Sequence, residues 1–351
     1  MPLREYLGAS PLYGIKTGFN EAFLIDQQTR DRLVGEDPKC EPIIKKFLRG
    51  RDIRRWHPQW GGEWMIFARR GIRISEYPSI KAHLSTFRSE LEPRPTDWDE
   101  STKGKWSGRK SGAYRWYEIQ DTIDYFQAFD KPKLMYQVIA FHSRVCLDEE
   151  GFYSNDKTFV LPVGDLYLLA LLNSSVLWRL AWAEFPHMKD EAIAMHGFAV
   201  EDLPIPTPSP KARAAVETRA RQLVVLARDQ YGQSSGFFAW LARKLGTVRV
   251  TQKLETYWQL DAATLGAEVR RGGASKLTPA AQRLLAEEHL RQLTALCPVL
   301  TKIRQLEIEL QHLVFDLYGL TPDEVQLLRS TAPPRDPLAL VEAMPLPPVR
   351  E

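Results

Sequence analysis

The sequence predicts an α+β protein, with a mixed-sheet domain followed by an antiparallel helical region. Up to about residue 205, short β-branched and aromatic runs alternate irregularly with helical segments and turn residues, a mixture that favours α+β over a regular α/β alternation. A stretch with proline at every second position follows at 203–210. Beyond it, leucine and isoleucine recur at helical spacing across 284–317, which places one apolar stripe along a helix.

Each strand that we expect in the first part is a short run of β-branched or aromatic residues. These runs are Phe23–Ile25, Trp64–Phe67, Trp116–Ile119, Leu134–Ile139 and Thr158–Leu161. Three segments between and after the runs have the apolar pattern of helices, namely Pro42–Leu48, Ile80–Phe87 and Asp165–Ala183. The polar segment Glu92–Gly112 predicts a long surface loop.

The second part predicts helices that pack side by side. They are Lys211–Asp229, Gly236–Leu245 and Leu284–Leu317, the last kinked or interrupted by Pro298. Alternate prolines cannot form a helix interior, so we place a domain boundary at the proline stretch. We therefore expect a first domain at 1–205, a helical spacer, dimerisation or docking region at 206–330, and a disordered proline-rich tail at 331–351.

Positive charge is concentrated locally, although the formal net charge is only +3. Residues 43–55 carry six cations and one acid, and residues 101–117 carry five cations and no acid. Trp56, Trp60, Trp106 and Trp116 lie in or beside these segments. Clustered cations beside aromatic rings are typical of a nucleic-acid surface, because the cations neutralise phosphates and the rings stack on bases.

A glycine-framed loop near the amino terminus repeats this theme. Gly14–Gly18 presents Lys16 and Thr17, and Asn20 follows directly before an apolar run. The candidate DNA-binding residues come from this loop, from the two basic clusters, and from two later positions, Lys133 and Asn155. Together they are Lys16, Thr17, Asn20, Lys45, Lys46, Arg49, Arg51, Arg54, Arg55, Lys103, Lys105, Arg109, Lys110, Arg115, Lys133 and Asn155.

Several of these residues also have a purely structural interpretation. Arg49 and Arg51 fit surface ion pairs, for example with Asp52, as well as phosphate contacts. Lys133 precedes an apolar strand and also fits an edge cation that blocks aggregation. Asn155 fits a turn as well as a base contact.

The sequence contains no complete set of catalytic or metal-binding residues. Its seven histidines lack metal-ligand spacing, and we find no nucleophile elbow, phosphate loop or Asp…Glu-x-Lys nuclease pattern. We therefore expect no catalytic residue, no metal ligand and no cofactor in this chain. Without a bilayer-length apolar run or a secretion signal, and with three widely separated cysteines, we expect a cytoplasmic protein with no membrane partner.

Four stretches of the sequence occur in a characteristic order. They are the Gly14–Asp26 loop and strand, Pro42–Ile53 with its Leu-Arg-Gly-Arg-Asp-Ile element, Trp116–Ile119 with Lys131–Gln137, and Ser154–Asp156 leading to Leu169–Ser174. In this order they resemble the TaqI-like carboxy-terminal specificity domain, the target-recognition domain of type IIG restriction-modification enzymes and adenine-specific DNA methyltransferases. The later segments Lys253–Leu260 and Phe315–Glu324 are similar to segments located after this domain in type IIG enzymes.

The resemblance implies sequence-specific recognition of double-stranded DNA on behalf of an adenine-specific methyltransferase domain or subunit, and possible association with a nuclease. S-adenosylmethionine and Mg²⁺ are implied for those catalytic domains. The glycine-rich cofactor loop and the Asn-Pro-Pro-aromatic motif of such methyltransferases do not occur in this sequence, so we expect no enzyme activity from the chain by itself.

We expect the basic segments of the first domain to converge on one face that accommodates a duplex. An alternative hypothesis is a protein-interaction or assembly subunit of such a complex, without direct DNA readout.

Overall fold

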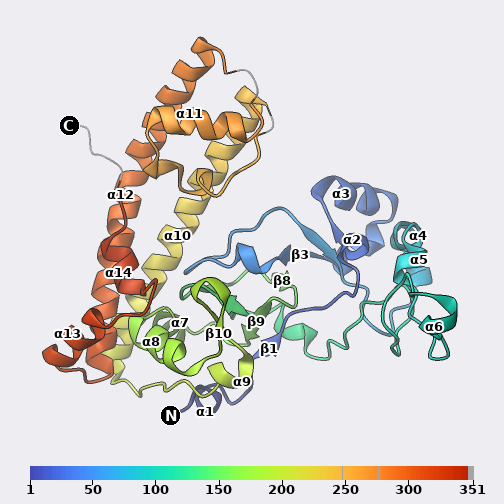
Figure 1. The fold of residues 1–351 in the computed structure, drawn as a ribbon, viewed down its shortest axis with the longest axis horizontal. Coiled ribbons are helices and arrows are strands. Elements are labelled where there is room, and N and C mark those ends of the chain that lie inside the picture. Colours follow the sequence, from blue (N-terminus) through green and yellow to red (C-terminus); the bar gives the residue numbers. More distant parts are fainter. Residues whose placement is uncertain (247, 275–276, 347–351) are drawn as a thin grey trace. The chain divides into compact units, whose positions relative to one another are not determined.

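The protein is represented by a computed structural model that describes residues 1–246, 248–274 and 277–346. The chain divides into two compact units. Unit 1 contains Met1–Asp165 and Leu180–Ile205, and unit 2 contains Leu166–Arg179 and the chain from Pro206 onward. The predicted α+β class is confirmed, because unit 1 combines sheets with helices and unit 2 is helical (Figure 1).

One four-stranded sheet of unit 1 is mixed. Its strand order is β2 (Leu24–Ile25), β4 (Trp64–Ile66), β3 (Ile44–Leu48) and β8 (Tyr153–Ser154). The pairs β2–β4 and β4–β3 are antiparallel, whereas β3 and β8 run parallel, with Phe47 opposite Tyr153. This parallel pair brings the end of β3 beside the turn that follows β8.

The other two sheets of unit 1 are antiparallel. One has the order β1 (Leu12–Tyr13), β9 (Thr158–Leu161), β5 (Lys133–Gln137) and β7 (Val145–Asp148). The smaller one has the order β10 (His187–Met188), β11 (Ala192–Ala194) and β6 (Ile139–Ala140). The turn from β8 to β9 passes directly from the mixed sheet to the antiparallel one.

Short helices surround these sheets. They are α1 (Leu3–Leu7), α2 (Asn20–Phe23), α3 (Gln27–Glu36), η1 (Pro38–Ile43), η2 (Gly50–Asp52), η3 (Ile74–Glu76), α4 (Pro78–Ser85), α5 (Arg88–Leu91), α6 (Glu100–Lys103), η4 (Phe126–Ala128), η5 (Lys189–Glu191) and α9 (Gly197–Val200). Phe23, Phe47, Met65 and Leu84, from α2, β3, β4 and α4, are fully buried in one core. That core fixes the strands that carry the candidate site.

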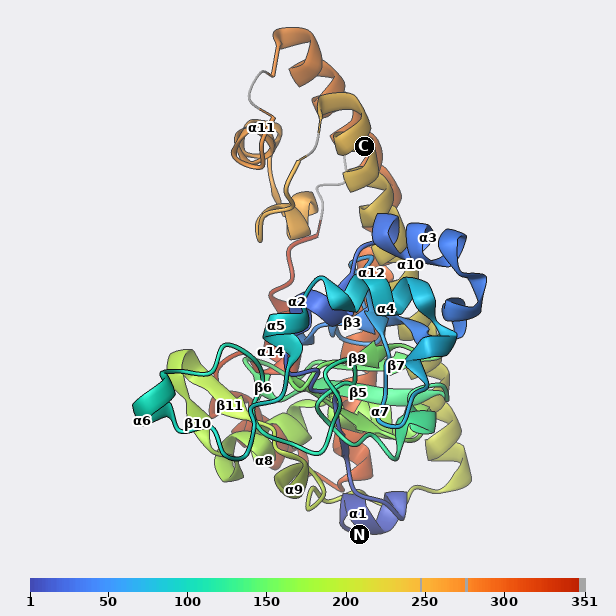
Figure 2. The ribbon, with the colours of Figure 1, turned by 90° about the vertical axis from the view of Figure 1, so that its right-hand side faces the viewer.

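Unit 2 is built on two long helices that run side by side in opposite directions (Figures 1 and 2). These are α10 (Pro210–Leu245) and α12 (Pro279–Leu317). The side chains of Ser209 and Thr278 cap their first turns, and each helix has proline at its start, where the missing N–H costs no hydrogen bond. The shorter helices are α7 (Leu166–Leu172), the first residues of α8 (Ser175–Glu184), η6 (Leu254–Gln259), α11 (Ala262–Arg271), α13 (Pro322–Ser330) and α14 (Pro337–Glu342).

A separate core closes the far end of the long hairpin. Phe237 of α10 stacks on Tyr257 of η6 with ring centroids 4.3 Å apart, and both are fully buried. Leu265 and Val269 of α11 join them. Burial raises the pKa of Tyr257 to about 12, because ionisation would place a charge in this apolar core.

Several elements differ from those predicted by the sequence. Pro42–Leu48 is not a helix, because Ile44–Leu48 pairs with β4 and β8 as strand β3. Trp116–Ile119 forms turns rather than a strand. The long helix expected at Asp165–Ala183 is broken at Asn173–Ser174 into α7 and α8.

The helical unit also departs from expectation at three places. The two helices expected at Lys211–Asp229 and Gly236–Leu245 form one continuous helix, α10. Helix α12 continues through Pro298 as one element, and Leu296 and Leu300 on either side of the proline are buried in one core. The tail contains helix α14, whose Leu338 and Val341 are buried, and Asp336 caps it by accepting from the Ala339 amide at 3.0 Å. Residues 347–351 of the expected disordered tail lie outside the described residues.

In the described part of the chain, no single helix is both long and apolar enough to cross a bilayer. By length and composition, α7 and α8 meet that test together, but they are bent by 57° at their junction.

Candidate nucleic-acid interface

The loop after β1 is held in place by the turn between β8 and β9. The Ile15 amide donates to the Ser154 carbonyl at 2.7 Å, and the Gly14 amide donates to the Thr158 carbonyl at 3.0 Å. A Cβ atom on Gly14 would lie only 1.9 Å from the Asn155 carbonyl oxygen. Glycine is therefore required at position 14, because any side chain would push the two loops apart.

This loop turns one candidate side chain outward and another inward. Lys16 is exposed, and in the described part of the chain its ammonium group makes no ion pair. Thr17 is buried, and its hydroxyl donates to the Asn20 side-chain oxygen at 2.8 Å. Lys16 is thus available to a ligand, whereas the Thr17 hydroxyl is used within the loop beside the exposed Asn20.

The loop after β3 reaches the same β8–β9 turn from the other side. A Cβ atom on Gly50 would lie 3.3 Å from both Cβ and the carbonyl oxygen of Lys157, and the Gly50 carbonyl accepts from the Gln137 side chain. Asp52 closes this loop by accepting from the Arg49 amide at 2.7 Å. The Arg51 side chain then projects into solvent, 74% exposed and 3.9 Å from the Asp52 carboxylate.

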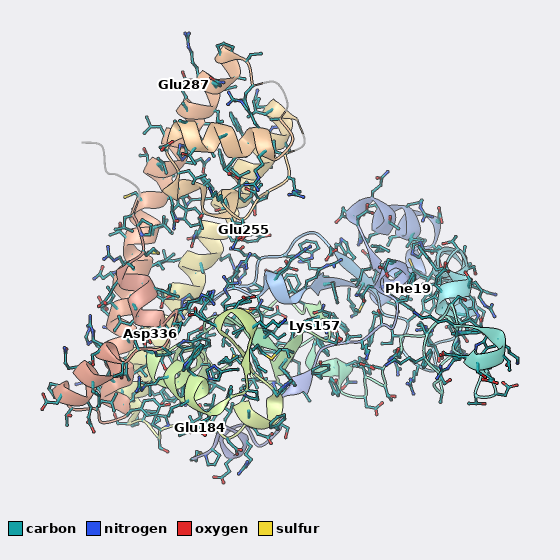
Figure 3. The ribbon with its side chains drawn as sticks, viewed as in Figure 1. Phe19, Lys157, Glu184, Glu255, Glu287 and Asp336 are labelled. Carbon is teal, nitrogen blue, oxygen red and sulfur yellow. The ribbon has the colours of Figure 1, made fainter. Side chains whose placement is uncertain are left out.

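The β8–β9 turn adds a cation that the sequence interpretation missed. Lys157 is labelled in Figure 3, its side chain is 66% exposed, and its ammonium group lies 3.3 Å from Asp156. Asn155 accepts from the Lys157 amide through its side chain and pairs with Ile15 through its backbone. We call residues 14–18, 50–52 and 155–157 the three-loop surface; its exposed cations are Lys16, Arg51 and Lys157.

Two carboxylates moderate the positive charge of the three-loop surface. Burial raises the pKa of Asp52, although its hydrogen bond from the Arg49 amide opposes the rise. Burial also raises the pKa of Asp121, which accepts from the Lys16 amide at 3.1 Å. Both acids hold the loops through backbone amides, so they shape the surface as well as reducing its charge.

The lysines of β3 point to opposite faces of the strand, as strand geometry requires. Lys45 pairs with Asp130 at 3.3 Å and lies over the Tyr153 ring, while Lys46 pairs with Glu150 at 3.0 Å. Arg49 makes a bidentate pair with Glu63, which raises the pKa of the arginine. A phosphate would have to compete with a carboxylate at each of these three cations.

The two following arginines are also engaged. Arg54 donates to the Gln59 side chain at 3.1 Å, and Arg55 donates to the Ser143 carbonyl at 3.4 Å while its guanidinium lies over the Trp56 ring. Trp56 is buried and bridges to β7, donating to the Val145 carbonyl at 3.0 Å. Arg54 and Arg55 therefore belong to the anchoring of this loop.

The part of the second basic cluster at helix α6 lies elsewhere in unit 1, although Arg109 of the same cluster bonds to the amino-terminal loop. Helix α6, which ends at Lys103, stands well away from β3 and β8 in both views (Figures 1 and 2). Lys103, Lys105 and Lys110 are exposed, with Lys103 over the Trp98 ring. Arg115 is exposed and donates to the Tyr117 hydroxyl at 2.7 Å. The structure thus brings the first cluster to the amino-terminal loop but leaves α6 apart.

Two candidate cations are interior rather than surface residues. Arg109 is buried, and its guanidinium donates to the carbonyls of Leu91, Thr17, Glu118, Arg115 and Trp116. Burial lowers its pKa to about 10. Lys133 is fully buried and pairs with an equally buried Asp148 across β5 and β7. Both residues hold the fold together and present no charge to solvent.

Metal binding finds no support in the described residues, where no three histidine, cysteine, aspartate or glutamate side chains gather into a possible ligand set.

Comparison with known proteins places two of the three loops, residues 50–52 and 155–157, within a recognised domain. Residues 45–205 match the TaqI-like C-terminal specificity domain, and residues 209–314 match a domain of unknown function, DUF8810. No curated protein matches the chain. Among solved structures, the chain is similar to the type IIL restriction-modification enzyme MmeI in complex with DNA, at 13% identity and a TM-score of 0.49.

That alignment covers 98% of this chain and 36% of the MmeI chain, so the present chain spans about a third of the length of the protein that it matches. The family match includes the strand β3, the loop of Arg51 and the turn of Lys157. The resemblance predicted by the sequence motifs is confirmed over this segment, because residues 45–205 match the model of the TaqI-like C-terminal specificity domain.

Proposed function

We propose that this chain is the sequence-recognition module of a restriction-modification system and that it binds double-stranded DNA through the three-loop surface. The observation that carries the proposal is the convergence of Lys16, Arg51 and Lys157, from three separate parts of the sequence, on loops that touch one another. The match of residues 45–205 to a specificity domain supports the same function.

The three cations suit different parts of the contact. Lysine acts as a point charge toward a phosphate oxygen, whereas the planar arginine fork can bind either a phosphate or the O6 and N7 atoms of guanine. The Arg51 side chain is 74% exposed, and the Asn155 amide on the neighbouring β8–β9 turn is a type of group that reads adenine edges. Phosphate contacts would fix the register, and Arg51 with Asn155 would contribute base discrimination.

We further propose that the module directs an adenine-specific methyltransferase domain or subunit and, in some arrangements, a nuclease. S-adenosylmethionine and Mg²⁺ would then bind those catalytic parts, and the site of action would be the cytoplasm. The support is the specificity-domain match together with the absence of methyltransferase motifs from this sequence. Methylation assays of the chain alone and mixed with a methyltransferase subunit test this step, and methyl transfer by the chain alone would contradict it.

Duplex binding is best measured by fluorescence anisotropy over a range of salt concentrations. The logarithm of affinity should fall linearly with the logarithm of salt concentration, because bound cations displace condensed counterions. Replacing Lys16, Arg51 and Lys157 together by glutamine should weaken binding and reduce the magnitude of this slope by about 2, one unit for each lost lysine–phosphate contact.

A matched control replaces Lys39, Lys81 and Lys131, three exposed cations of the same unit, by glutamine. This control changes the net charge equally and should leave the slope nearly unchanged. Equal slopes for both triple variants would contradict the proposed surface. Partner binding by a chain that shows no DNA affinity at all would instead favour the alternative of an assembly subunit.

A further inference from the structure

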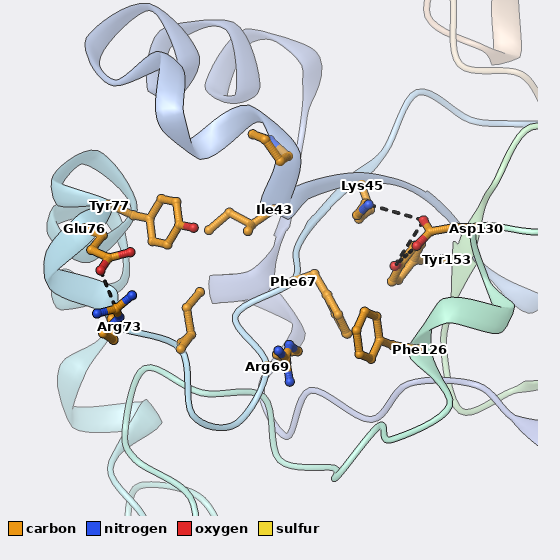
Figure 4. A pocket seen from close by; sticks show the side chains of 12 residues that line it. Ile43, Lys45, Phe67, Arg69, Arg73, Glu76, Tyr77, Phe126, Asp130 and Tyr153 are labelled. Carbon is orange, nitrogen blue, oxygen red and sulfur yellow. Dashed lines mark hydrogen bonds and ion pairs between the residues drawn. The ribbon is translucent and has the colours of Figure 1, made fainter.

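A pocket of about 340 Å³ lies in unit 1 between β3, the loop after β4, and the helices η1, η3 and η4 (Figure 4). Its size is at the lower end of the range of about 300–1,000 Å³ that small-molecule sites occupy. Aromatic side chains form much of its wall. Phe67 lies 5.9 Å from Phe126 and 4.9 Å from Tyr153, measured between ring centroids, and Tyr77 lies on the opposite side, beyond Ile43.

Three cations and two carboxylates also line this pocket. Lys45 pairs with Asp130 at 3.3 Å, and Arg73 pairs with Glu76 at 2.9 Å. Arg69 is exposed and makes no ion pair in the part of the chain that the structure describes. The pocket therefore carries one uncompensated positive charge at a known position.

The Arg69 guanidinium is held by an aromatic ring rather than by an acid. It lies 4.8 Å from the centre of the Phe126 ring, an arrangement that cation–π attraction stabilises. A guanidinium in this position retains its N–H donors for a ligand. Its planar fork matches the oxygen atoms of a phosphate, with which it makes paired, charge-assisted hydrogen bonds.

We propose that this pocket binds a nucleoside monophosphate group, with the base against the aromatic wall that includes Tyr77 and the phosphate on Arg69. Aromatic walls accept any of the four bases, since each base has a face that stacks on an aromatic ring. The single uncompensated cation matches one phosphate group. This site is distinct from the three-loop surface and uses a residue, Arg69, that the cation clusters of the sequence do not include.

The loop of Arg69 is nevertheless connected to the three-loop surface. The Ile119 amide donates to the Ala68 carbonyl at 2.8 Å, and the Asp121 amide donates to the Lys16 carbonyl at 3.2 Å. Residues 119–121 thus link the pocket loop to the amino-terminal loop. The nucleotide can have two sources, a free nucleotide or an unstacked nucleotide of a bound DNA; only the second source rests on the proposed function.

The first experiment measures binding of free dAMP and of deoxyadenosine to the full chain by calorimetry. The expected result is tighter binding of dAMP than of deoxyadenosine. The substitution Arg69→Gln should weaken dAMP binding about tenfold, to the level of the nucleoside, because a charge-assisted phosphate contact is lost. Arg32→Gln is the matched control, since Arg32 is a half-exposed arginine on α3 outside the pocket, and it should bind dAMP like the unmodified chain.

The second experiment uses a duplex with one 2-aminopurine, whose fluorescence rises when the base leaves the stack. A rise on binding that is lost in both Arg69→Gln and Tyr77→Ala identifies DNA as the source, whereas Arg69-dependent dAMP binding without such a rise identifies a free nucleotide. Circular dichroism confirms that each variant folds. If neither dAMP binding nor the rise in 2-aminopurine fluorescence depends on Arg69, the inference is overturned. If the chain binds dAMP but fails to bind duplex DNA, only the proposed function is overturned.

Discussion

A cation's position in the sequence does not tell whether it faces solvent or holds the fold together. Arg109 lies in a polar, basic segment with Lys105 and Lys110, yet it alone is buried there, and its guanidinium joins five backbone carbonyls. Lys133 likewise precedes an apolar strand but faces Asp148 in the interior. The sequence lacks a local signal for either case, because the partners are up to 92 residues away along the chain.

The buried Lys133–Asp148 ion pair should make a large contribution to the stability of the fold. Lys133→Ala should lower the free energy of unfolding by about 3–5 kcal/mol, since it leaves the buried Asp148 carboxylate without its countercharge. Asp148 also accepts from the Glu150 and Phe152 amides, so it cannot relax away from the site. Urea unfolding of the full chain measures the change.

Lys131 provides the control for this substitution, because it lies two positions away and is exposed. Lys131→Ala should change the free energy of unfolding by less than about 0.5 kcal/mol. If both variants unfold at the same urea concentration, the buried ion pair of Lys133 does not stabilise the fold.

Where the hydrophobic pattern of a segment fitted both a helix and a strand, its pairing with distant strands determined which element formed. Ile43, Ile44, Phe47 and Leu48 fit one face of a helix by spacing, but β-branched residues also favour strands. The pairing of β3 with β4 and with β8 is not visible from this segment alone. The prediction of a helix at Leu284–Leu317 was confirmed by α12, because a helix with one apolar stripe depends less on which partner covers it.

Close contact between the amino-terminal loop and the β8–β9 turn should be necessary for DNA binding. Gly14→Ala should separate the amino-terminal loop from the β8–β9 turn, because the added methyl group would collide with the Asn155 carbonyl. The chain should remain folded, while its affinity for duplex DNA should fall about tenfold as Lys16 moves away from Lys157. Anisotropy titration measures the affinity, and hydrogen exchange of the Ile15 amide reports the separation.

Gly35→Ala is the matched glycine substitution. Gly35 lies in helix α3 with no atom near its would-be Cβ, so alanine should stabilise the helix by about 0.5–1 kcal/mol. Duplex affinity should not change in this variant. Unchanged affinity in Gly14→Ala as well would show that contact between the loops is unnecessary for binding.

At the scale of the whole molecule, the sequence motifs indicated the family and the fold class, but only the structure sorted the candidate residues by position. It brought the loop of Lys16 against the β8–β9 turn of Lys157 through a hydrogen bond between Ile15 and Ser154, two residues 139 positions apart. It also placed α6 away from that contact (Figure 1). Composition could not provide either result, since both depend on which loops the sheets bring together.

The net charge of +3 is small, so we expect the local arrangement of cations, not the total charge, to determine DNA binding. Lys157→Glu and Lys302→Glu each reduce the formal net charge from +3 by two, to +1. Lys157 lies on the three-loop surface, whereas Lys302 is exposed on α12 and bonded to Gln305 at 3.2 Å. Lys157→Glu should weaken duplex binding about tenfold near 0.1 M salt, where charges more than about 10 Å from the contact are largely screened. Lys302→Glu should change it less than twofold. Equal losses in the two variants would mean that overall charge attracts the DNA, and a larger loss for Lys302→Glu would move the contact to the helical unit.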